Sequence, residues 1–127
     1  MNKVKYIPGD IVKLNNEVVT IAETNLFCYS IIDSSGDFYT NVVYNIKPIP
    51  LTSEIFEKNG WEKCNITGAL KNHYIGCFKN QLNVYFREDK TEVFIKGKEV
   101  PLQHSLKYVH QFQHLLFGLG LNSKMEV

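Results

Sequence analysis

Apolar and polar positions alternate in short stretches over the first 50 residues, which is the pattern of half-buried β-strands. The predicted strands cover residues 11–14, 17–21, 26–33 and 38–40. Asn15 and Asn16 lie between the first two strands, and asparagine adopts the left-handed backbone angles that a tight hairpin requires. Pro48 and Pro50 exclude a continued central strand. Strands this short and this closely joined predict a small SH3-like barrel or a strongly bent meander over residues 1–50.

A short helix is predicted within residues 51–60 from the signals at its two ends. The hydroxyl of Thr52 can cap the first turn, and Leu51 and Phe56 have the spacing of a hydrophobic staple. Gly60 supplies the left-handed residue that ends the helix. Trp61 follows at the position that often packs back on the last turn, so we expect its ring to contact Phe56.

A second group of strands is predicted between residues 61 and 100, at 61–64, 73–78, 82–87, 92–95 and 99–100. Val84 and Phe86 alternate with polar neighbours, as in a strand with one face buried and the other in water. The short connections between these strands favour a second antiparallel sheet.

The last apolar segment has the period of an α-helix from about His104 or Ser105 to Phe117. One face carries Leu106, Val109, Phe112, Leu116 and Leu119, and Tyr108, Leu115 and Phe117 widen it. The apolar face covers about half of the circumference, more than a surface helix needs. Either this helix is central to the fold, or part of its apolar face contacts a partner.

Together these elements predict an α+β fold in a single compact domain of 127 residues. Its parts are an SH3-like β subunit at 1–50, a linking helix at 51–60, and a second antiparallel sheet packed by the C-terminal helix at 61–127.

Charge and hydropathy exclude several classes of partner. Fourteen basic and thirteen acidic residues leave a net charge of +1, which does not favour nucleic acid or an anionic membrane. No apolar run approaches the roughly 18 residues of a membrane span, and residues 1–6 lack the apolar segment of a signal peptide.

The three cysteines, Cys28, Cys64 and Cys77, are odd in number and form no C-x-x-C pair. We therefore expect reduced thiols and a cytoplasmic location.

Two polar features of the C-terminal helix are candidate site residues. Gln113 falls within the apolar face, where it either ties down a loop or strand carbonyl or lines a pocket or oligomer contact. His110 and His114 have the spacing of a helical zinc pair, but a third ligand would have to be recruited from His104 or His73 without guidance from the sequence. The simpler interpretation is a solvated or boundary histidine pair, so we expect no metal and no other cofactor.

No catalytic motif is present. The cysteines and histidines have no spacing that selects a nucleophile and its base, and the G-x-S-x-G signature and a phosphate-binding loop are both missing. Bases and aromatics alternate between Tyr74 and Lys98, a pattern that can stack nucleotides. Acidic residues are mixed among them, which favours an ordinary strand with its polar face outward.

Two blocks of sequence resemble a known family. Residues 49–61, which read IPLTSEIFEKNGW, resemble an IPLT-x-E-x-L-x-K-x-G-F block, and residues 106–115, which read LKYVHQFQHL, resemble an I-K-Y-V-H-Q-L-Q-x-L ending. Both are similar to a family of small uncharacterised proteins of Bacteroides-type bacteria, their phages and mobile elements. Pro8-Gly9-Asp10 fits the usual opening of that family, whereas residues 117–120 depart from its usual ending. The resemblance implies a setting and no catalytic residues.

These observations favour a non-enzymatic binding protein of phage or mobile-element origin that occupies a host protein in the host cytoplasm or assembles with itself. The alternatives are a protein that sequesters a nucleotide signal of host defence, and a metal-assisted enzyme that uses the His110/His114 pair. The candidate binding residues are Trp61, Tyr108, His110, Gln111, Gln113 and His114.

Overall fold

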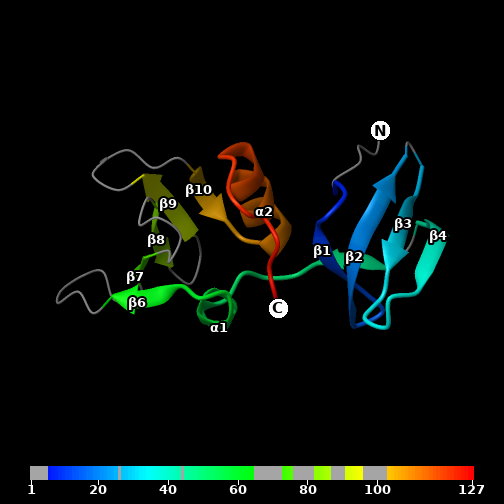
Figure 1. The fold of residues 1–127 in the computed structure, drawn as a ribbon, viewed down its shortest axis with the longest axis horizontal. Helices are drawn as coiled ribbons and strands as arrows, with labels where there is room; N and C mark the ends of the chain where they lie inside the picture. Colours follow the sequence, from blue (N-terminus) through cyan, green and yellow to red (C-terminus); the bar gives the residue numbers. More distant parts are fainter. Residues whose placement is uncertain are drawn as a thin grey trace. The chain divides into compact units, whose positions relative to one another are not determined.

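The computed structural model describes residues 6–25, 27–43, 45–64, 73–75, 82–86, 91–95 and 103–127, and these form an α+β fold (Figure 1). The chain divides into two compact units. The first unit combines Met1–Pro50 with Tyr108–Met125, and the second combines Leu51–Lys107 with Glu126–Val127.

The first unit contains a five-stranded antiparallel sheet whose strand order is β4-β3-β2-β1-β5. Its strands are β1 (Ile11–Leu14), β2 (Glu17–Thr24), β3 (Tyr29–Ile32), β4 (Phe38–Val42) and β5 (Ile46–Pro48). Asn15 and Asn16 have φ angles of 51° and 69°, so the predicted tight hairpin between β1 and β2 is confirmed. The predicted strand at 38–40 is present and extends to Val42.

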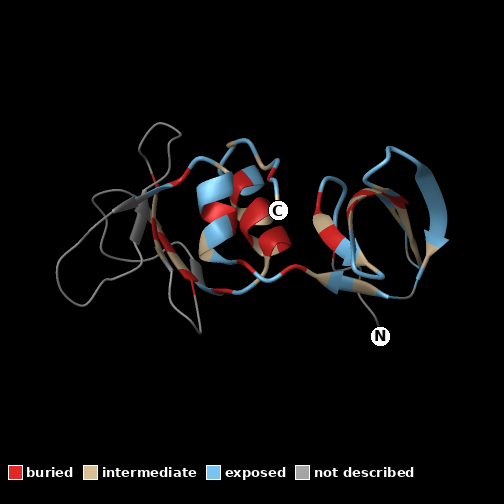
Figure 2. Cartoon of the chain, turned by 90° about the horizontal axis from the view of Figure 1, so that it is seen from below, coloured by how far each residue is buried: buried red, intermediate tan, exposed pale blue. Residues whose placement is uncertain are grey.

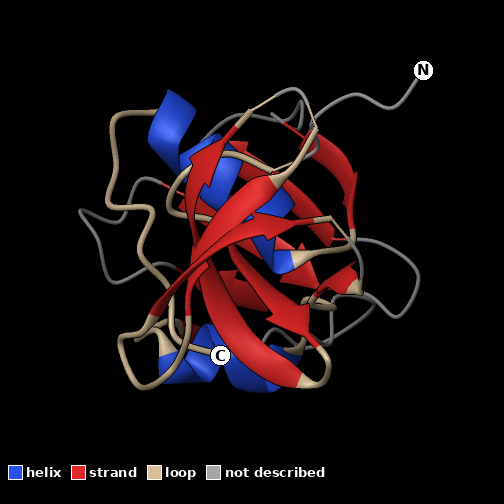
Figure 3. Ribbon diagram, turned by 90° about the vertical axis from the view of Figure 1, so that its right-hand side faces the viewer, coloured by secondary structure: helices blue, strands red, loops and turns tan. Residues whose placement is uncertain are grey.

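The sheet is open, since β4 and β5 are its two edges and no pairing between them is present in the described residues. The expected SH3-like barrel is therefore not confirmed. Register shifts between β2 and β3 and between β3 and β4 bend the sheet. Figure 3, in which this sheet faces the viewer, shows how strongly its strands twist.

The core of the first unit forms on one face of this sheet. Five side chains are buried together: Tyr6, Val12, Val19, Ile21 and Ile31. In β1 and β2 these positions alternate with less buried ones, which is the period-2 pattern expected of half-buried strands.

In the second unit, helix α1 (Ser53–Lys58) has the predicted ends. The Thr52 hydroxyl accepts a hydrogen bond from the backbone N–H of Ile55 at 3.3 Å. At the other end Gly60 has a φ of +81°, and the N–H of Trp61 donates to the carbonyl of Phe56 at 3.0 Å. The rings of Phe56 and Trp61 meet edge to face with centroids 5.6 Å apart, which confirms the predicted contact.

The second unit also contains a five-stranded antiparallel sheet, with the order β10-β9-β8-β7-β6. Its strands are β6 (Glu62–Cys64), β7 (His73–Ile75), β8 (Leu82–Phe86), β9 (Thr91–Ile95) and β10 (Gln103–Leu106). Val84 and Val93 lie opposite each other and are fully buried, as the alternation around Val84 predicts. The predicted strand at 99–100 and the Phe86 side chain lie outside the described residues.

The helical prediction for residues 104–108 is wrong. Residues 103–106 form strand β10, which pairs with β9, and helix α2 (Val109–Gly118) begins only after Tyr108. Ser105 has a φ of +60°, which is incompatible with a continuous right-handed helix. Pairing with β9 satisfies the backbone of this segment from outside, and a tertiary partner of this kind overrides helical periodicity.

Helix α2 belongs to the unit of the first sheet, where it contacts β1, although the sequence assigns it to the second sheet. Val109, Phe112 and Leu116 are buried as the apolar face predicts. Phe117 and Leu119 are exposed, so the buried face is narrower than the apolar arc in the sequence. Figure 2 shows both buried and exposed faces on this helix.

Candidate functional site

Asp10 and His114 form a polar contact between the start of β1 and helix α2. Nε2 of His114 lies 3.0 Å from Oδ1 and 2.8 Å from Oδ2 of Asp10. Oδ2 of Asp10 also accepts a hydrogen bond from the backbone N–H of Ile7 at 2.9 Å. Asp10 is only 2% exposed, whereas His114 is partly open to water. The contact therefore joins two segments 104 residues apart and completes the hydrogen bonding of a buried carboxylate.

Burial raises the pKa of Asp10 above its ordinary value, because a charged carboxylate loses hydration in the interior. The N–H of Ile7 and the His114 side chain act in the opposite direction, since both favour the ionised form. The desolvation effect is the larger one, so ionising Asp10 in the folded protein costs free energy, which the contacts with Ile7 and His114 only partly offset.

Gln113 is buried, and both ends of its amide are satisfied. Its Nε2 donates to the carbonyl oxygens of Gly9 and Ser123, each at 3.0 Å, and its Oε1 accepts from the N–H of Ile11 at 2.9 Å. The amide thus holds the chain before β1 and the segment after α2 against the helix. Of the two interpretations drawn from the sequence, the structural tie is the one observed.

His110 is a buried ring within an aromatic group. Its centroid lies 4.9 Å from Tyr6 in an edge-on contact, 5.9 Å from Tyr108 in a stacked one, and 5.6 Å from His114. Through these ring contacts His110 contributes to the packing between the helix and the first sheet.

Burial raises the pKa of the Tyr6 hydroxyl, and negative charge on Tyr29 and Asp10 adds to the effect.

The remaining candidates on the C-terminal helix, Tyr108 and Gln111, lie at the start of α2, whereas Trp61 lies in the other unit. Oε1 of Gln111 accepts from the backbone N–H of Tyr108 at 3.1 Å, which is half of a capping box. Trp61 is buried against Phe56 in the second unit. The structure thus brings Tyr108, His110, Gln113 and His114 together with Tyr6 and Asp10, and it gives Trp61 a separate structural role.

Asp10 and His114 have the arrangement in which a carboxylate orients an imidazole. Asp10 is the only hydrogen-bond partner of the His114 ring in the described part of the chain. No three His, Cys, Asp or Glu side chains among the described residues are arranged to hold a metal ion. His104 and His73, the other ligands considered, have side chains outside the described residues.

Most of the exposed apolar side chains described in the first unit lie on or next to a different element, the β3–β4 hairpin. Phe27 is 84% exposed, Phe38 52%, Tyr39 49% and Val43 49%, and Ile32, which is opposite Phe38, is also exposed. Five of the nine exposed large apolar residues in the described chain therefore lie between positions 27 and 43. Strand β4 is exposed along nearly all of its length (Figure 2).

The two edges of this sheet differ in how they resist pairing with another strand. The β5 edge is three residues long and carries Lys47 and Pro48, both of which discourage strand addition. At the other edge, strand β4 has five residues, Phe38-Tyr39-Thr40-Asn41-Val42, with no charge and no proline. One irregularity interrupts it, at Asn41, whose φ is +58°. We call the segment from Phe38 to Val43 the β4 edge; of the two edges it is the one open to a partner strand.

Acidic side chains surround one end of the β4 edge. The negative charges of Asp33 and then Asp37 raise the pKa of the Tyr39 hydroxyl above its ordinary value. Glu17 lies nearby, since its Oε2 accepts from the Ser34 hydroxyl at 3.1 Å. The β4 edge thus combines an apolar strand with a negative potential at its β3–β4 turn.

The sequence contained a signal for this surface that our predictions did not use. Phe38 and Tyr39 are adjacent in a strand, and adjacent strand residues point to opposite faces. At least one of the two aromatics therefore had to face away from the core. What the sequence did not show is that β4 lies at an edge, because this depends on the order of the strands.

Comparison of the chain with protein-family models, with curated proteins and with solved structures finds no match. Among the described residues, no helix is both long enough and apolar enough to span a membrane.

Proposed function

We propose that this protein is a non-catalytic protein-binding module, and that its β4 edge is the docking surface. The observation that carries the proposal is an uncharged, aromatic edge strand, exposed on the side away from β3, in a sheet whose other edge is short and carries a lysine and a proline. An extended segment of a partner would hydrogen-bond to the open backbone of β4 and extend the sheet by one strand.

The side chains of the β4 edge indicate what such a segment contains. Phe38 and Val43 offer apolar contact, so a partner strand with β-branched or aromatic residues would remove their surface from water. The acidic groups at the β3–β4 turn favour a Lys or Arg at the adjoining end of that strand. The partner is therefore an apolar strand with a basic flank, supplied by another protein or by a second copy of this chain.

The test compares the unmodified chain with Phe38→Lys, which places a positive charge on the edge. Phe117→Lys is the matched control, because Phe117 is also an exposed aromatic of the first unit but lies on α2. Self-association is measured by sedimentation velocity over a range of concentrations. Binding to other proteins is measured by capture from a bacterial lysate and mass spectrometry.

We expect one of the two measurements to show an association that Phe38→Lys abolishes and Phe117→Lys preserves. Backbone amides of β4 should exchange with solvent more slowly in that complex, since they become hydrogen-bonded. The proposal is wrong if the chain is a monomer at all concentrations and every captured protein binds equally to both variants.

The origin of the chain in a phage or mobile element, with action in the host cytoplasm, is part of the same proposal and is supported by the resemblance of residues 49–61 and 106–115. The nucleotide-sequestering alternative was based on residues between Tyr74 and Lys98. In that stretch the described aromatic side chains are Tyr85 and Phe94, which meet edge to face. The exposed β4 edge is the observation that supports the protein-binding function.

A further inference from the structure

Two lysines occupy directly opposite positions on neighbouring strands of the first sheet. Lys13 of β1 pairs in register with Lys47 of β5. Their neighbours Val12 and Leu14 are turned toward the core, so both lysines extend from the opposite, exposed face. Like charges opposite each other destabilise an antiparallel pair, because the side chains are held close together. A counter-charge between them would remove this cost.

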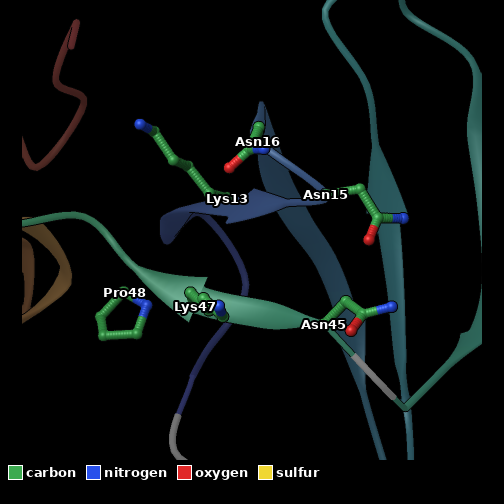
Figure 4. A pocket seen from close by; sticks show the side chains of 6 residues that line it. All are labelled: Lys13, Asn15, Asn16, Asn45, Lys47 and Pro48. Carbon is green, nitrogen blue, oxygen red and sulfur yellow. The ribbon is translucent and has the colours of Figure 1, made fainter.

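Three asparagines complete a pocket around the lysine pair. Asn15, Asn16 and Asn45 line it together with Lys13, Lys47 and Pro48, as Figure 4 shows. All three asparagines have positive φ angles, 51°, 69° and 66°, which the hairpin and the approach to β5 impose. These turns hold the amide groups at the end of the strand pair, where each can donate hydrogen bonds.

The charge of this pocket is uncompensated in the part of the chain that the structure describes. No Asp or Glu lines the pocket, and no ion pair of Lys13 or Lys47 with a described carboxylate is present. The nearest Glu in the sequence, Glu17, is bonded to Ser34 instead. Two lysines and three asparagines therefore line one cavity, and no described carboxylate lies among its lining residues.

The charge of the cavity suits a phosphate group, and its volume leaves room for one. Its volume is about 260 Å³, just under the range of roughly 300–1,000 Å³ that holds drug-sized ligands. A phosphate monoester carries about −1.5 to −2 charges at neutral pH and has three strong acceptor oxygens. Two ammonium groups balance this charge, and the amides can bond to the remaining oxygen lone pairs.

We propose that the pocket between Lys13 and Lys47, which we call the lysine–asparagine pocket, binds a phosphate group. The ligand is either free inorganic phosphate or the phosphate of a small monoester. This site is separate from the β4 edge, since it lies at the β1–β5 side of the sheet, and it does not depend on the protein-binding function.

The test is a titration of the ¹⁵N-labelled chain followed by NMR, with potassium phosphate, AMP and adenosine as ligands and with potassium chloride at matched ionic strength as the baseline. We expect phosphate or AMP to give saturable shifts at the amides of Asn15, Asn16 and Asn45. The double variant K13Q/K47Q should bind at least about tenfold more weakly, because two charge-assisted contacts are lost. Lys124→Gln is the control, an exposed lysine of the same unit outside the pocket.

The two sources of phosphate are distinguished by their relative affinities. Tighter binding of AMP assigns the site to a phosphate ester, and equal or tighter binding of inorganic phosphate assigns it to the free ion. The inference is overturned if phosphate and AMP cause no more change than chloride, if adenosine binds as well as AMP, or if K13Q/K47Q titrates like the unmodified chain. The spectra of each variant also report directly whether it is folded.

Discussion

At the scale of the residue, the buried polar side chains of the first unit decide how its parts are held together. Asp10 and Gln113 both lie within a largely apolar interior, yet each has several hydrogen-bond partners. A buried polar group of this kind adds little net stability when satisfied, but its loss leaves the partners unsatisfied. The main effect of these residues is therefore to fix where α2 packs on the chain before β1, and their net contribution to stability is small.

Asp10 predicts a specific dependence of stability on pH. Because its pKa is raised by burial, the folded state holds the proton to a higher pH than the unfolded state does. The stabilising contribution of protonated Asp10 to the free energy of unfolding is then fully present below the ordinary pKa of about 3.9. This contribution is lost as the pH rises through the raised pKa of the folded state. Asp10→Asn removes this titration and keeps the size of the side chain.

We expect the free energy of unfolding of the unmodified chain to fall relative to Asp10→Asn as pH rises from about 4 toward neutrality. Urea unfolding at a series of pH values measures the difference. A rise instead of a fall would mean that the contacts to His114 and Ile7 outweigh desolvation.

At the scale of the element, the ends of helices and hairpins follow from a few neighbouring residues. The cap at Thr52, the end of α1 at Gly60 and the hairpin at Asn15-Asn16 were all predicted correctly. Each of these features depends on backbone angles and hydrogen bonds within about six residues, so the local sequence is sufficient.

Two glycines at helix ends should respond in opposite ways to a methyl group. Gly60→Ala should cost about 1–2 kcal/mol, because the φ of Gly60 is +81° and an L-residue is strained there. Gly118→Ala should stabilise by about 0.4–1 kcal/mol. Gly118 has no positive φ, and its added Cβ would meet nothing within 4 Å. Urea unfolding of both variants gives the comparison, and a stabilised Gly60→Ala would contradict the assigned helix end.

At the scale of the whole molecule, contacts between distant segments decide which elements form and where they pack. Residues 103–106 have a helical pattern but form a strand, because β9 offers a pairing partner. Helix α2 joins the first sheet through hydrogen bonds between Gln113 and Ile11 and between His114 and Asp10, each between residues more than 100 positions apart. The open edge at β4 likewise results from strand order, which periodicity within one segment does not contain.

Gln113→Leu tests this long-range tie. The substitution keeps the volume of the side chain but leaves the N–H of Ile11 and the carbonyls of Gly9 and Ser123 without their partner. We expect a loss of about 1–3 kcal/mol in the free energy of unfolding. The substitution should speed up exchange of the Ile11 backbone amide and leave the exchange rate of the Ile55 amide unchanged. Ile55 belongs to α1 in the other unit and is the internal reference. Unchanged exchange at Ile11 would contradict the role assigned to Gln113.

The sequence by itself determined the α+β class, the first hairpin, the two ends of α1 and the buried face of α2, because these depend on periodicity and on caps a few residues long. It also identified the polar residues of α2 as candidates and offered a structural tie as one interpretation of Gln113, but it did not show which segments Gln113 and His114 hold. Only the tertiary structure decided that residues 103–106 pair as β10, that α2 packs with the first sheet, and that an aromatic strand and a lysine pair lie exposed. Those outcomes depend on which distant segment supplies the hydrogen bonds and the apolar contact, and that choice is made when the chain folds as a whole.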